Sequence, residues 1–370
     1  MTDFDPDRAA ADLLHHADRD HASGRPLGPP IVPASLYVLP GEPAGPYQYG
    51  RWTNPTWDAT EHALATLEGA PVVSFPSGMA AIASVLCSLV RSGQRVLLPS
   101  DGYYTTRLLA DQYLRPNGVI VEECPTVAMA EVDLTGFDLV FVETPSNPTL
   151  QLCDLSALAE RATEAGAVTV ADNTTMTPLG QRPLDHGIDL IVSSDTKAVN
   201  GHSDVLFGHV AGRNPELLER VKQWRTVSGA IPGHFESWLV HRGLETLELR
   251  FNRMCDSAEV IAGRLVGHRA IRSVNHPGLA FHPQHALARR QMYRHGLLVG
   301  IEFADAAVAN TFAEQTRLVT PATSFGGTHT IADRRARWGD QVPEGYVRLS
   351  VGCEPTEPLW AAINQTLDAL

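Results

Sequence analysis

The chain has 370 residues, of which 44% are hydrophobic, and this length and composition allow a globular protein with two domains. Its formal net charge is −13, from 29 basic and 42 acidic residues, and no Lys/Arg cluster is present, so we expect no nucleic-acid binding. The five cysteines form no C-x-x-C pair, which argues against a disulfide framework or a structural metal and predicts a reducing, cytoplasmic environment.

The N-terminal 56 residues are predicted to form an extended arm. The first twenty residues are acidic and lack the apolar segment of a signal peptide. No apolar run in the chain approaches the roughly 20 residues of a membrane span, so no membrane association is expected. His15, His16 and His21 have no matching carboxylate spacing and are interpreted as part of a solvated segment. Residues 21–56 are rich in Pro and Gly, which is typical of an extended connection.

From residue 56 onward, helical and strand patterns alternate. Their apolar strand runs are continuous, which is typical of strands buried on both faces of a parallel sheet. The pattern predicts helices over residues 56–69, 77–90, 103–114 and 154–167, and strands over 71–75, 95–99, 118–123, 137–144, 168–173 and 189–194. Gly69 is expected to end the first helix, and Asp154 to cap the fourth. This alternation predicts an α/β fold with a mostly parallel, doubly wound sheet.

The pattern changes at about residue 236. Residues 236–265 predict one long helix or two abutting helices, followed by strands at 297–303 and 346–352 and a closing helix at 357–370. We therefore expect three parts: the arm (1–56), an α/β domain (57–235) and a smaller C-terminal α+β domain (236–370).

Polar residues follow five of the predicted strands, where an open parallel sheet binds its ligands. In chain order they are Ser77-Gly78-Met79, Asp101 and Tyr103, Ser146 and Asn147, Asp172 and Asn173, and Ser194, Thr196 and Lys197. Taken singly, these residues have ordinary explanations. Lys197 can be a solvated charge, Asp172 a helix cap and Tyr103 a packing residue. Their ordered series at equivalent strand ends favours a shared site.

The residue types in this series suit one cofactor. A glycine-containing helix N-terminus binds a phosphate, an aspartate pairs with a protonated ring nitrogen, and a lysine forms a Schiff base with an aldehyde. These three groups together describe pyridoxal phosphate. Lys197 and Lys222 are the only lysines, because the other 27 basic residues are arginines. Arginine cannot form a Schiff base or release its proton, so a lysine at this strand end is informative.

Competing motifs are absent from the sequence. Neither G-x-G-x-x-G nor G-x-x-x-x-G-K-[ST] occurs, which argues against the common nucleotide-binding folds. "GHSD" (201–204) offers a serine beside His202 but lacks the G-x-S-x-G elbow, so a structural role is expected for His202.

Several longer segments resemble the Cys/Met-metabolism family of fold-type I pyridoxal-phosphate enzymes. They are "YGRWTNPT" (49–56), "FPSGMAAI" (75–82), "ETPSNPTL" (143–150), "VADNTTMTPLGQRPLDHGIDLIVSSDTKAVNGHSDVLFG" (170–208), "SWLVHRGLETLELR" (237–250) and "RLSVGCE" (348–354). The resemblance runs from about Leu27 to Leu370. The family includes cystathionine γ-lyase, γ-synthase and β-lyase, and methionine γ-lyase.

The resemblance implies a role for each matching residue. Lys197 would carry pyridoxal phosphate covalently and act as the base, and Asp172 would pair with its ring nitrogen. Gly78, Met79, Ser194 and Thr196 would bind the phosphate, while Tyr49 and Arg51 would reach the phosphate of a neighbouring subunit. Tyr103 would stack on the ring and take part in proton transfer. Asn147 and Arg348 would hold the substrate carboxylate, with Ser324 and His329 also beside the substrate. A homo-oligomer, a dimer of dimers, is therefore expected.

The implied activity is α,γ-elimination on a γ-substituted L-amino acid such as L-cystathionine, giving a 2-oxo acid, ammonia and a thiol. The alternatives are a γ-replacement enzyme, a methionine γ-lyase, and a specialised-metabolism enzyme that uses a vinylglycine-type intermediate. A cofactor-binding regulator without turnover is a further alternative, against which the full set of Lys197, Asp172, Tyr103 and Arg348 argues.

Three segments depart from the family pattern. "YYTT" (103–106) stands where Y-G-G-T or Y-G-C-T is usual, and "SFGGTHTI" (324–331) where S-L-G-G-x-E-S-L is usual. The following segment, "ADRRARWGDQVPEG" (332–345), is shortened and recast. His329 replaces a glutamate found near the distal end of the substrate in several members. It is either a specificity change or a neutral loop replacement.

Overall fold

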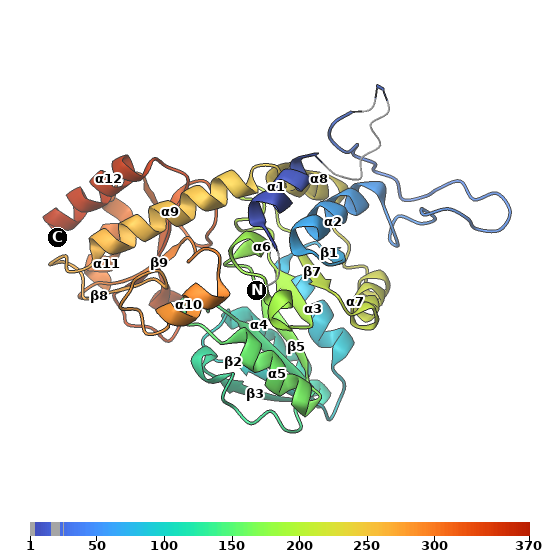
Figure 1. Cartoon of the computed structure of the whole chain (residues 1–370), viewed down its shortest axis with the longest axis horizontal. Coiled ribbons are helices and arrows are strands. Elements are labelled where there is room, and N and C mark those ends of the chain that lie inside the picture. Colours follow the sequence, from blue (N-terminus) through green and yellow to red (C-terminus); the bar gives the residue numbers. More distant parts are fainter. Residues whose placement is uncertain (1–3, 16–22, 25) are drawn as a thin grey trace.

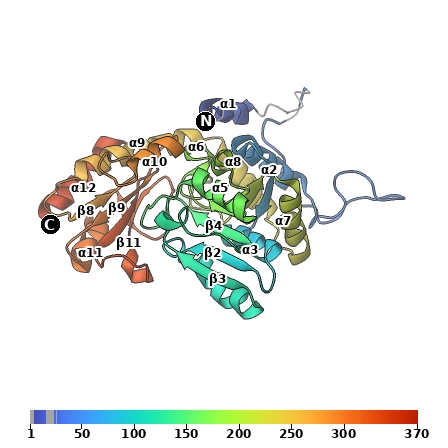
Figure 2. The same cartoon turned by 60° about the horizontal axis from the view of Figure 1, so that its bottom comes forward.

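The computed structural model describes residues 4–15, 23, 24 and 26–370 and contains two β-sheets (Figure 1). Helices surround the larger sheet, and the smaller sheet lies near the C-terminus (Figures 1 and 2). The predicted α/β class is confirmed. None of the helices in the described ranges has the length and hydropathy to cross a membrane.

The large sheet has seven strands in the order β1-β7-β6-β5-β4-β2-β3. Their bounds are β1 Val72–Phe75, β2 Arg95–Pro99, β3 Ile120–Cys124, β4 Leu139–Glu143, β5 Val168–Asp172, β6 Leu190–Ser193 and β7 Gly208–Gly212. The pairs among β2 to β6 are parallel, and only β7 is antiparallel to both of its neighbours. Because β1 and β6 both run against β7, β1 ends at the same edge as β4, β5 and β6. That edge collects the residues that follow these strands.

Helices cover both faces of this sheet (Figure 2). Their bounds are α2 Pro55–Glu68, α3 Gly78–Leu89, α4 Tyr104–Leu109, α5 Leu155–Ala165, α6 Thr177–Gly180, α7 Pro215–Ser228 and α8 His234–Leu244. Helices α3 and α7 share one apolar core with the sheet, and α5 shares another with strands of the same sheet. All residues of β1, β4, β6 and β7 are buried, as expected for strands covered on both faces.

Local chemistry explains where the predicted helices begin and end. Asn54 caps α2 by accepting a hydrogen bond from the Thr56 N–H at 2.9 Å, and Gly69 ends the helix at φ 62°. Asp154 caps α5 as predicted. The helix predicted over 103–114 is present, but it is an α-helix only over Tyr104–Leu109 and a π-helix over Ala110–Leu114. The chain then tightens into a 3₁₀ turn (Arg115–Asn117) that contains a proline.

The prediction of an extended arm over residues 1–56 is wrong for its beginning. Residues Pro6–His15 form helix α1, which turns the apolar side chains of Ala9, Ala10 and Leu13 toward the core. Their spacing is helical, a signal that the acidic composition concealed. His16 and His21 lie outside the described residues. Residues 26–54 have neither helix nor strand beyond one bridge, between Leu36 and Tyr49, and project from the body of the molecule (Figure 1).

The small sheet has five strands in the order β10-β11-β12-β9-β8. The strands are β8 Ser273–Asn275, β9 Leu298–Glu302, β10 Val319–Pro321, β11 Thr330–Arg334 and β12 Tyr346–Ser350, and the helices are α9 Leu247–Leu265, α10 His285–Gln291, α11 Ala306–Gln315 and α12 Thr356–Ala369. Helices α9, α11 and α12 share one apolar core with β9, β11 and β12. Helices α8 and α9 abut within residues 236–265, so the two-helix alternative is confirmed.

Candidate active site

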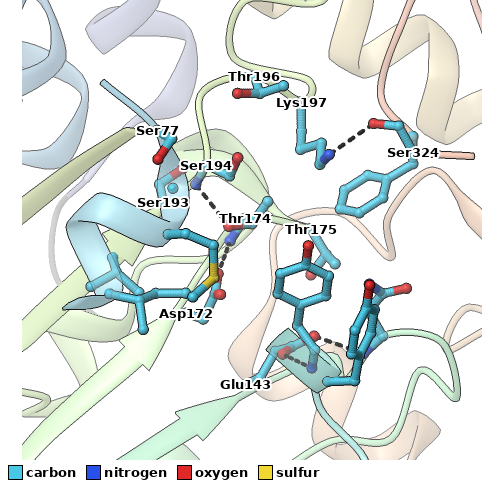
Figure 3. Close-up of a pocket in the computed structure, with 18 of the residues that line it drawn as sticks. Ser77, Glu143, Asp172, Thr174, Thr175, Ser193, Ser194, Thr196, Lys197 and Ser324 are labelled. Atoms are coloured by element: carbon cyan, nitrogen blue, oxygen red, sulfur yellow. Dashed lines mark hydrogen bonds between the residues drawn. The ribbon is translucent and has the colours of Figure 1, made fainter. Parts of the chain in front are cut away.

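A cavity of about 380 Å³ lies at the edge of the large sheet where β1, β4, β5 and β6 end (Figure 3). Side chains from the segments after these strands form its floor, and residues of the C-terminal part of the chain close its other side. Ten of the thirteen predicted site residues line it: Gly78, Met79, Tyr103, Asn147, Asp172, Ser194, Thr196, Lys197, Ser324 and Arg348. The fold thus brings together residues that lie up to 270 positions apart in the sequence.

Lys197 lies in the loop after β6, and its side chain points across the cavity toward Ser324 (Figure 3). Its Nζ donates a hydrogen bond to the Ser324 Oγ at 2.8 Å and lies 5.3 Å from the centroid of the Phe325 ring. Burial lowers the pKa of Lys197 to about 8, and the positive charges of Arg348 and Arg335 act in the same direction, against the opposing charge of Asp172. The lowered pKa increases the neutral fraction of this amine near neutral pH, and the neutral form is the one that acts as a nucleophile and a base.

Ser324 owes its place to an unusual backbone conformation. Its φ is 79°, in the left-handed region that a residue with a side chain rarely adopts. In this conformation its hydroxyl meets Lys197, while its carbonyl accepts a hydrogen bond from Arg348 Nη2 at 2.7 Å. Strained backbone of this kind concentrates at functional sites, where the surrounding structure holds it.

Asp172 ends β5 on the floor of the cavity, beside Glu143 at the end of β4. The Asp172 Oδ1 accepts a hydrogen bond from the Thr174 N–H at 2.9 Å. Burial raises the pKa of Asp172, against the opposing effects of Thr174 and Lys197. The position suits a carboxylate that receives a cationic partner from within the cavity, because such a partner would favour its charged form.

Glu143 is a second buried floor carboxyl group that the sequence interpretation missed. It accepts hydrogen bonds from the backbone N–H groups of Tyr103 at 2.6 Å and Asn147 at 2.8 Å, so it fixes two loops around the cavity. Burial raises its pKa well above the usual range, and the neighbouring charge of Asp172 adds to this. The signal for it was its place as the last residue of a buried strand, aligned with Asp172.

The N-terminus of α3 forms one end of the cavity. Ser77 caps the helix by accepting a hydrogen bond from the Ala80 N–H at 3.1 Å, and Ser77, Gly78 and Met79 line the cavity. A Cβ on Gly78 would lie 2.5 Å from the Cβ of Ser194, so only glycine allows the helix to approach the lysine loop this closely. A helix N-terminus with adjacent Ser and Thr hydroxyls is suited to a phosphate group.

Arg348, on β12, is buried at another side of the cavity. Its Nη1 donates a hydrogen bond to the Asn147 Oδ1, and its Nε has no hydrogen-bond partner among the described residues. Burial lowers the pKa of Arg348 to about 10, with a contribution from Arg335 and against the opposing charge of Asp333. A buried, incompletely paired guanidinium is an anion site, because leaving a charged donor unsatisfied costs free energy that a bound carboxylate offsets.

Three predicted site residues lie outside the lining of this cavity. Tyr49 and Arg51 belong to the projecting arm, where Arg51 donates a hydrogen bond to the Thr226 carbonyl and lies over the Tyr49 ring. His329 is exposed just before β11, with its Nδ1 3.3 Å from the Thr328 Oγ1. Two other strand-end residues, Asp101 and Ser146, contact each other outside the cavity lining. The predicted structural role of His202 agrees with its 2.6 Å contact with the Asn200 carbonyl.

The sequence interpretation also missed part of the outer wall of the cavity. Arg335 and Trp338 line it from the 3₁₀-helix η5 (Arg335–Trp338), inside the recast segment 332–345. Thr174 and Thr175 line its floor, and the Thr174 Oγ1 accepts a hydrogen bond from the Ser194 N–H at 2.9 Å (Figure 3). No group of His, Cys, Asp and Glu side chains in the described ranges is arranged to hold a metal ion.

The fold and this cavity define a pyridoxal-phosphate-type site, and comparisons with known proteins agree. The model of the Cys/Met metabolism PLP-dependent enzyme family matches residues 11–368. A Streptomyces coelicolor protein provisionally named a cystathionine gamma-lyase is 46% identical over 350 residues, covering 93% of this chain and 89% of that protein.

Two solved structures of similar proteins cover nearly the whole chain. A cystathionine gamma synthase from Xanthomonas oryzae pv. oryzae, in complex with aminoacrylate and cysteine, matches with a TM-score of 0.93 at 34% identity, covering 99% of this chain and 98% of that one. CalE6, a methionine gamma lyase from Micromonospora echinospora, matches with a TM-score of 0.91 at 35% identity, covering 99% and 100%. The chain belongs to the Cys/Met metabolism family of PLP-dependent enzymes.

Proposed function

We propose that this enzyme is a carbon–sulfur lyase that catalyses α,γ-elimination on a γ-substituted L-amino acid such as L-cystathionine. The products are a 2-oxo acid, ammonia and a thiol. The observation that carries the proposal is Lys197: its amine has a pKa lowered to about 8 and lies in a cavity with a carboxylate floor and a buried arginine. These groups support binding of an amino-acid carboxylate and removal of a proton from Cα, with which such an elimination begins.

The residues of the cavity fit pyridoxal phosphate. Gly78, Met79, Ser194 and Thr196 would hold its phosphate at the α3 N-terminus, where a Cβ on Gly78 would collide with the Ser194 side chain. Asp172 would hold the ring nitrogen in its protonated form, and Lys197 would hold the aldehyde carbon covalently. When bound, the cofactor supplies an electron sink that stabilises negative charge at the substrate Cα.

Lys197 is the proposed base of the reaction. In its free, neutral form, its amine would accept the proton from Cα of the substrate. Ser324 orients the amine through the 2.8 Å hydrogen bond to Nζ, and its own carbonyl is held by Arg348. Ser324 therefore contacts both the proposed base, Lys197, and the proposed carboxylate-binding residue, Arg348.

Arg348 and Asn147 are the proposed partners of the substrate carboxylate. The unpaired Nε of Arg348 is available to a carboxylate oxygen, and the bond from Nη1 to Asn147 sets the plane of the guanidinium group. Tyr103, anchored at its backbone by Glu143, is proposed to stack on the cofactor ring and to take part in proton transfer. A proton is then lost from Cβ, the electrons of that bond form a Cβ–Cγ double bond, and the Cγ–S bond breaks with its electron pair on sulfur, which takes up a proton and leaves as the thiol. Water completes the balance by releasing the remaining carbon chain as a 2-oxo acid and ammonia.

The arm is proposed to complete the site of a neighbouring subunit through Tyr49 and Arg51, in a cytoplasmic dimer of dimers. Its exposed apolar side chains support this role, because Leu27, Leu36 and Val38 are 86%, 74% and 92% exposed. Apolar side chains gathered on a projecting segment are typical of a surface that another protein chain covers. The division into an arm (1–56), a cofactor domain (57–235) and a C-terminal domain (236–370) is part of the same proposal.

The test of the function is a substrate assay with and without an added thiol. The purified holoenzyme is incubated with L-cystathionine, L-methionine and O-acyl-L-homoserines, and the 2-oxo acid and free thiol are measured. Release of 2-oxo acid and thiol without an added nucleophile supports the lyase. Formation of a new thioether only when a thiol is added would contradict it and establish γ-replacement.

A further inference from the structure

The outer wall of the cavity is formed by the recast segment 332–345. There β11 runs into η5, which brings Arg335 and Trp338 to the lining. The Trp338 side chain is 47% exposed, and Tyr104, another residue of the lining, is 41% exposed. The wall therefore presents aromatic surface that is not packed against the protein core.

The charged side chains of this segment satisfy one another. The Nη1 of Arg335 lies 2.6 Å from the Asp333 Oδ2, and its Nη2 lies 2.7 Å from the Asp340 Oδ2. Asp333 also accepts hydrogen bonds from Arg337 at 2.7 Å and from the Trp338 Nε1 at 3.1 Å. The side chains of Asp333 and Asp340 are 0% and 4% exposed. This network fixes the indole ring and leaves no carboxylate of the wall free to pair with a ligand cation.

The formal charge of the wall can be balanced by one substrate carboxylate. Arg335, Arg337 and Arg348 contribute three positive charges, and Asp333 and Asp340 two negative ones, so the formal sum is +1. A substrate α-carboxylate on Arg348 brings this sum to zero. A second carboxylate at the far end of the substrate would find no unpaired cation in this network, because Arg335 and Arg337 are already paired with Asp333 and Asp340.

A distal ammonium group has no acidic partner at this wall either. The acidic residues among those lining the cavity are Glu143 and Asp172, which both lie on the floor at strand ends. His329 is exposed and outside the lining. The outer wall thus offers no unpaired partner, among the described residues, to either charged group of a second amino-acid moiety.

We propose that Trp338, held by the network of Asp333, Arg335 and Asp340, forms a distal subsite for an uncharged γ-substituent. Within the γ-substituted amino acids of the proposed function, the subsite favours an alkyl thioether or a neutral acyl ester against the indole ring, and it makes substrates whose substituent ends in a carboxylate or an amino-acid group, such as L-cystathionine, the poorer ones. This inference rests on the proposed function, because it requires the α-carboxylate to bind at Arg348.

Two matched substrate pairs test the subsite in the holoenzyme. L-Methionine is compared with L-cystathionine, and O-acetyl-L-homoserine with O-succinyl-L-homoserine, by kcat/KM for release of 2-oxobutanoate. We expect the uncharged member of each pair to be preferred by about tenfold or more, the factor that follows from one unmatched polar contact of about 1.4 kcal/mol. Equal values, or a preference for the charged members, would overturn the proposal.

Variants of Trp338 link this preference to the indole. We expect Trp338→Ala to raise the KM for L-methionine about fivefold or more with little change in kcat. We expect Trp338→Phe to leave the KM for L-methionine close to the wild-type value. Trp338→Glu supplies a carboxylate and should shift the preference toward L-cystathionine. Trp360→Ala, on α12 and outside the cavity lining, is the matched control and should leave the preference unchanged. An unchanged KM for L-methionine and an unchanged preference in Trp338→Ala would contradict the assignment.

A binding experiment separates this inference from the proposed function. L-Norleucine and L-2-aminoadipate lack a leaving group and differ in the distal carboxylate. Their dissociation constants are measured by calorimetry on the wild-type holoenzyme and on Trp338→Ala. Tighter binding of L-norleucine that is lost in Trp338→Ala supports the subsite, even if no substrate yields a 2-oxo acid and the lyase proposal fails. Equal binding of the two compounds overturns the subsite, whatever the enzyme turns over.

Discussion

The floor and the outer wall of the cavity are built in different ways. The floor residues Asp172 and Lys197 follow buried strands of the large sheet, and Glu143 ties two of its loops together through backbone hydrogen bonds. Arg335 and Trp338 of the outer wall lie in a four-residue 3₁₀-helix, and ion pairs within segment 332–345 hold them. The sheet edge is suited to positioning a cofactor, whereas ion pairs within one short segment position the wall. From this contrast we propose that the floor carries the chemistry and the wall substrate choice.

The largest expected effect concerns the floor. Lys197→Ala should lower kcat by at least about 10³-fold for every substrate, because it removes both the covalent attachment and the base. Lys197→Arg should be as inactive, because arginine neither forms the attachment nor gives up its proton. The control is Lys222→Arg, which changes an exposed residue of α7. If the Lys197 variants lost activity toward one substrate alone, a floor residue would be acting in substrate choice, and the contrast between floor and wall would fail.

The next largest expected effect is on stability and concerns a buried charged cluster beneath the loop that carries Lys197. His209 on β7 is fully buried, with its Nδ1 2.9 Å from Asp195 and its Nε2 3.2 Å from Glu68. Burial alone would lower the pKa of His209, but the two carboxylates outweigh it and raise the pKa to about 10. Because the folded pKa lies above the ordinary value, the stabilisation is complete below pH 6.5 and is lost as the pH rises through about 10.

We expect His209→Gln to lower the free energy of unfolding by about 3 kcal/mol near pH 7, because it leaves two buried carboxylates without their cation. Urea denaturation at several pH values measures this quantity. The loss relative to the wild type should shrink as the pH rises from about 6.5 to about 10. A variant as stable as the wild type at pH 7 would show that the floor does not depend on this cluster.

A smaller effect distinguishes the carboxylate site from the distal wall. Arg348→Lys should raise the KM about tenfold for all amino-acid substrates alike, because lysine loses the planar donor geometry and one charge-assisted bond. Steady-state kinetics with L-methionine and L-cystathionine measure the effect. A change in the ratio of kcat/KM between the two substrates would mean that Arg348 also acts in substrate choice.

The smallest effect is a pH dependence of cofactor attachment. The lowered pKa of Lys197 means that its neutral, nucleophilic form increases as the pH rises through about 8. The rate at which apoenzyme binds added pyridoxal phosphate should therefore rise severalfold between pH 7 and 9 and then level off. Stopped-flow absorbance measures it. A rate that rises only above pH 10 would indicate an ordinary lysine.

The floor was largely predictable from the sequence, because it depends on local patterns. Apolar runs define the strands, and Asp172 and Lys197 come directly at their ends. Glu143 was missed because it lies inside the predicted strand, whereas the search for site residues considered the positions after each strand. Strand β7 was missed because it is five residues long and begins and ends with glycine, which weakens a strand signal.

The outer wall was not predictable in the same way. Segment 332–345 was recognised as a departure from the family, but no local pattern places Arg335 and Trp338 against Lys197, which lies more than 130 residues earlier. Their position depends on how the small sheet sits against the large one and on the left-handed turn at Ser324. Such long-range placement needs the three-dimensional structure.

The most direct test of the central claim uses the two lysines of the chain. Holoenzyme is reduced with borohydride, which fixes a cofactor held on a lysine, and its peptides are analysed by mass spectrometry. The account predicts that the pyridoxyl phosphate mass lies on the peptide with Lys197 and is absent from the peptide with Lys222. Label on Lys222, or no label on Lys197, would contradict it.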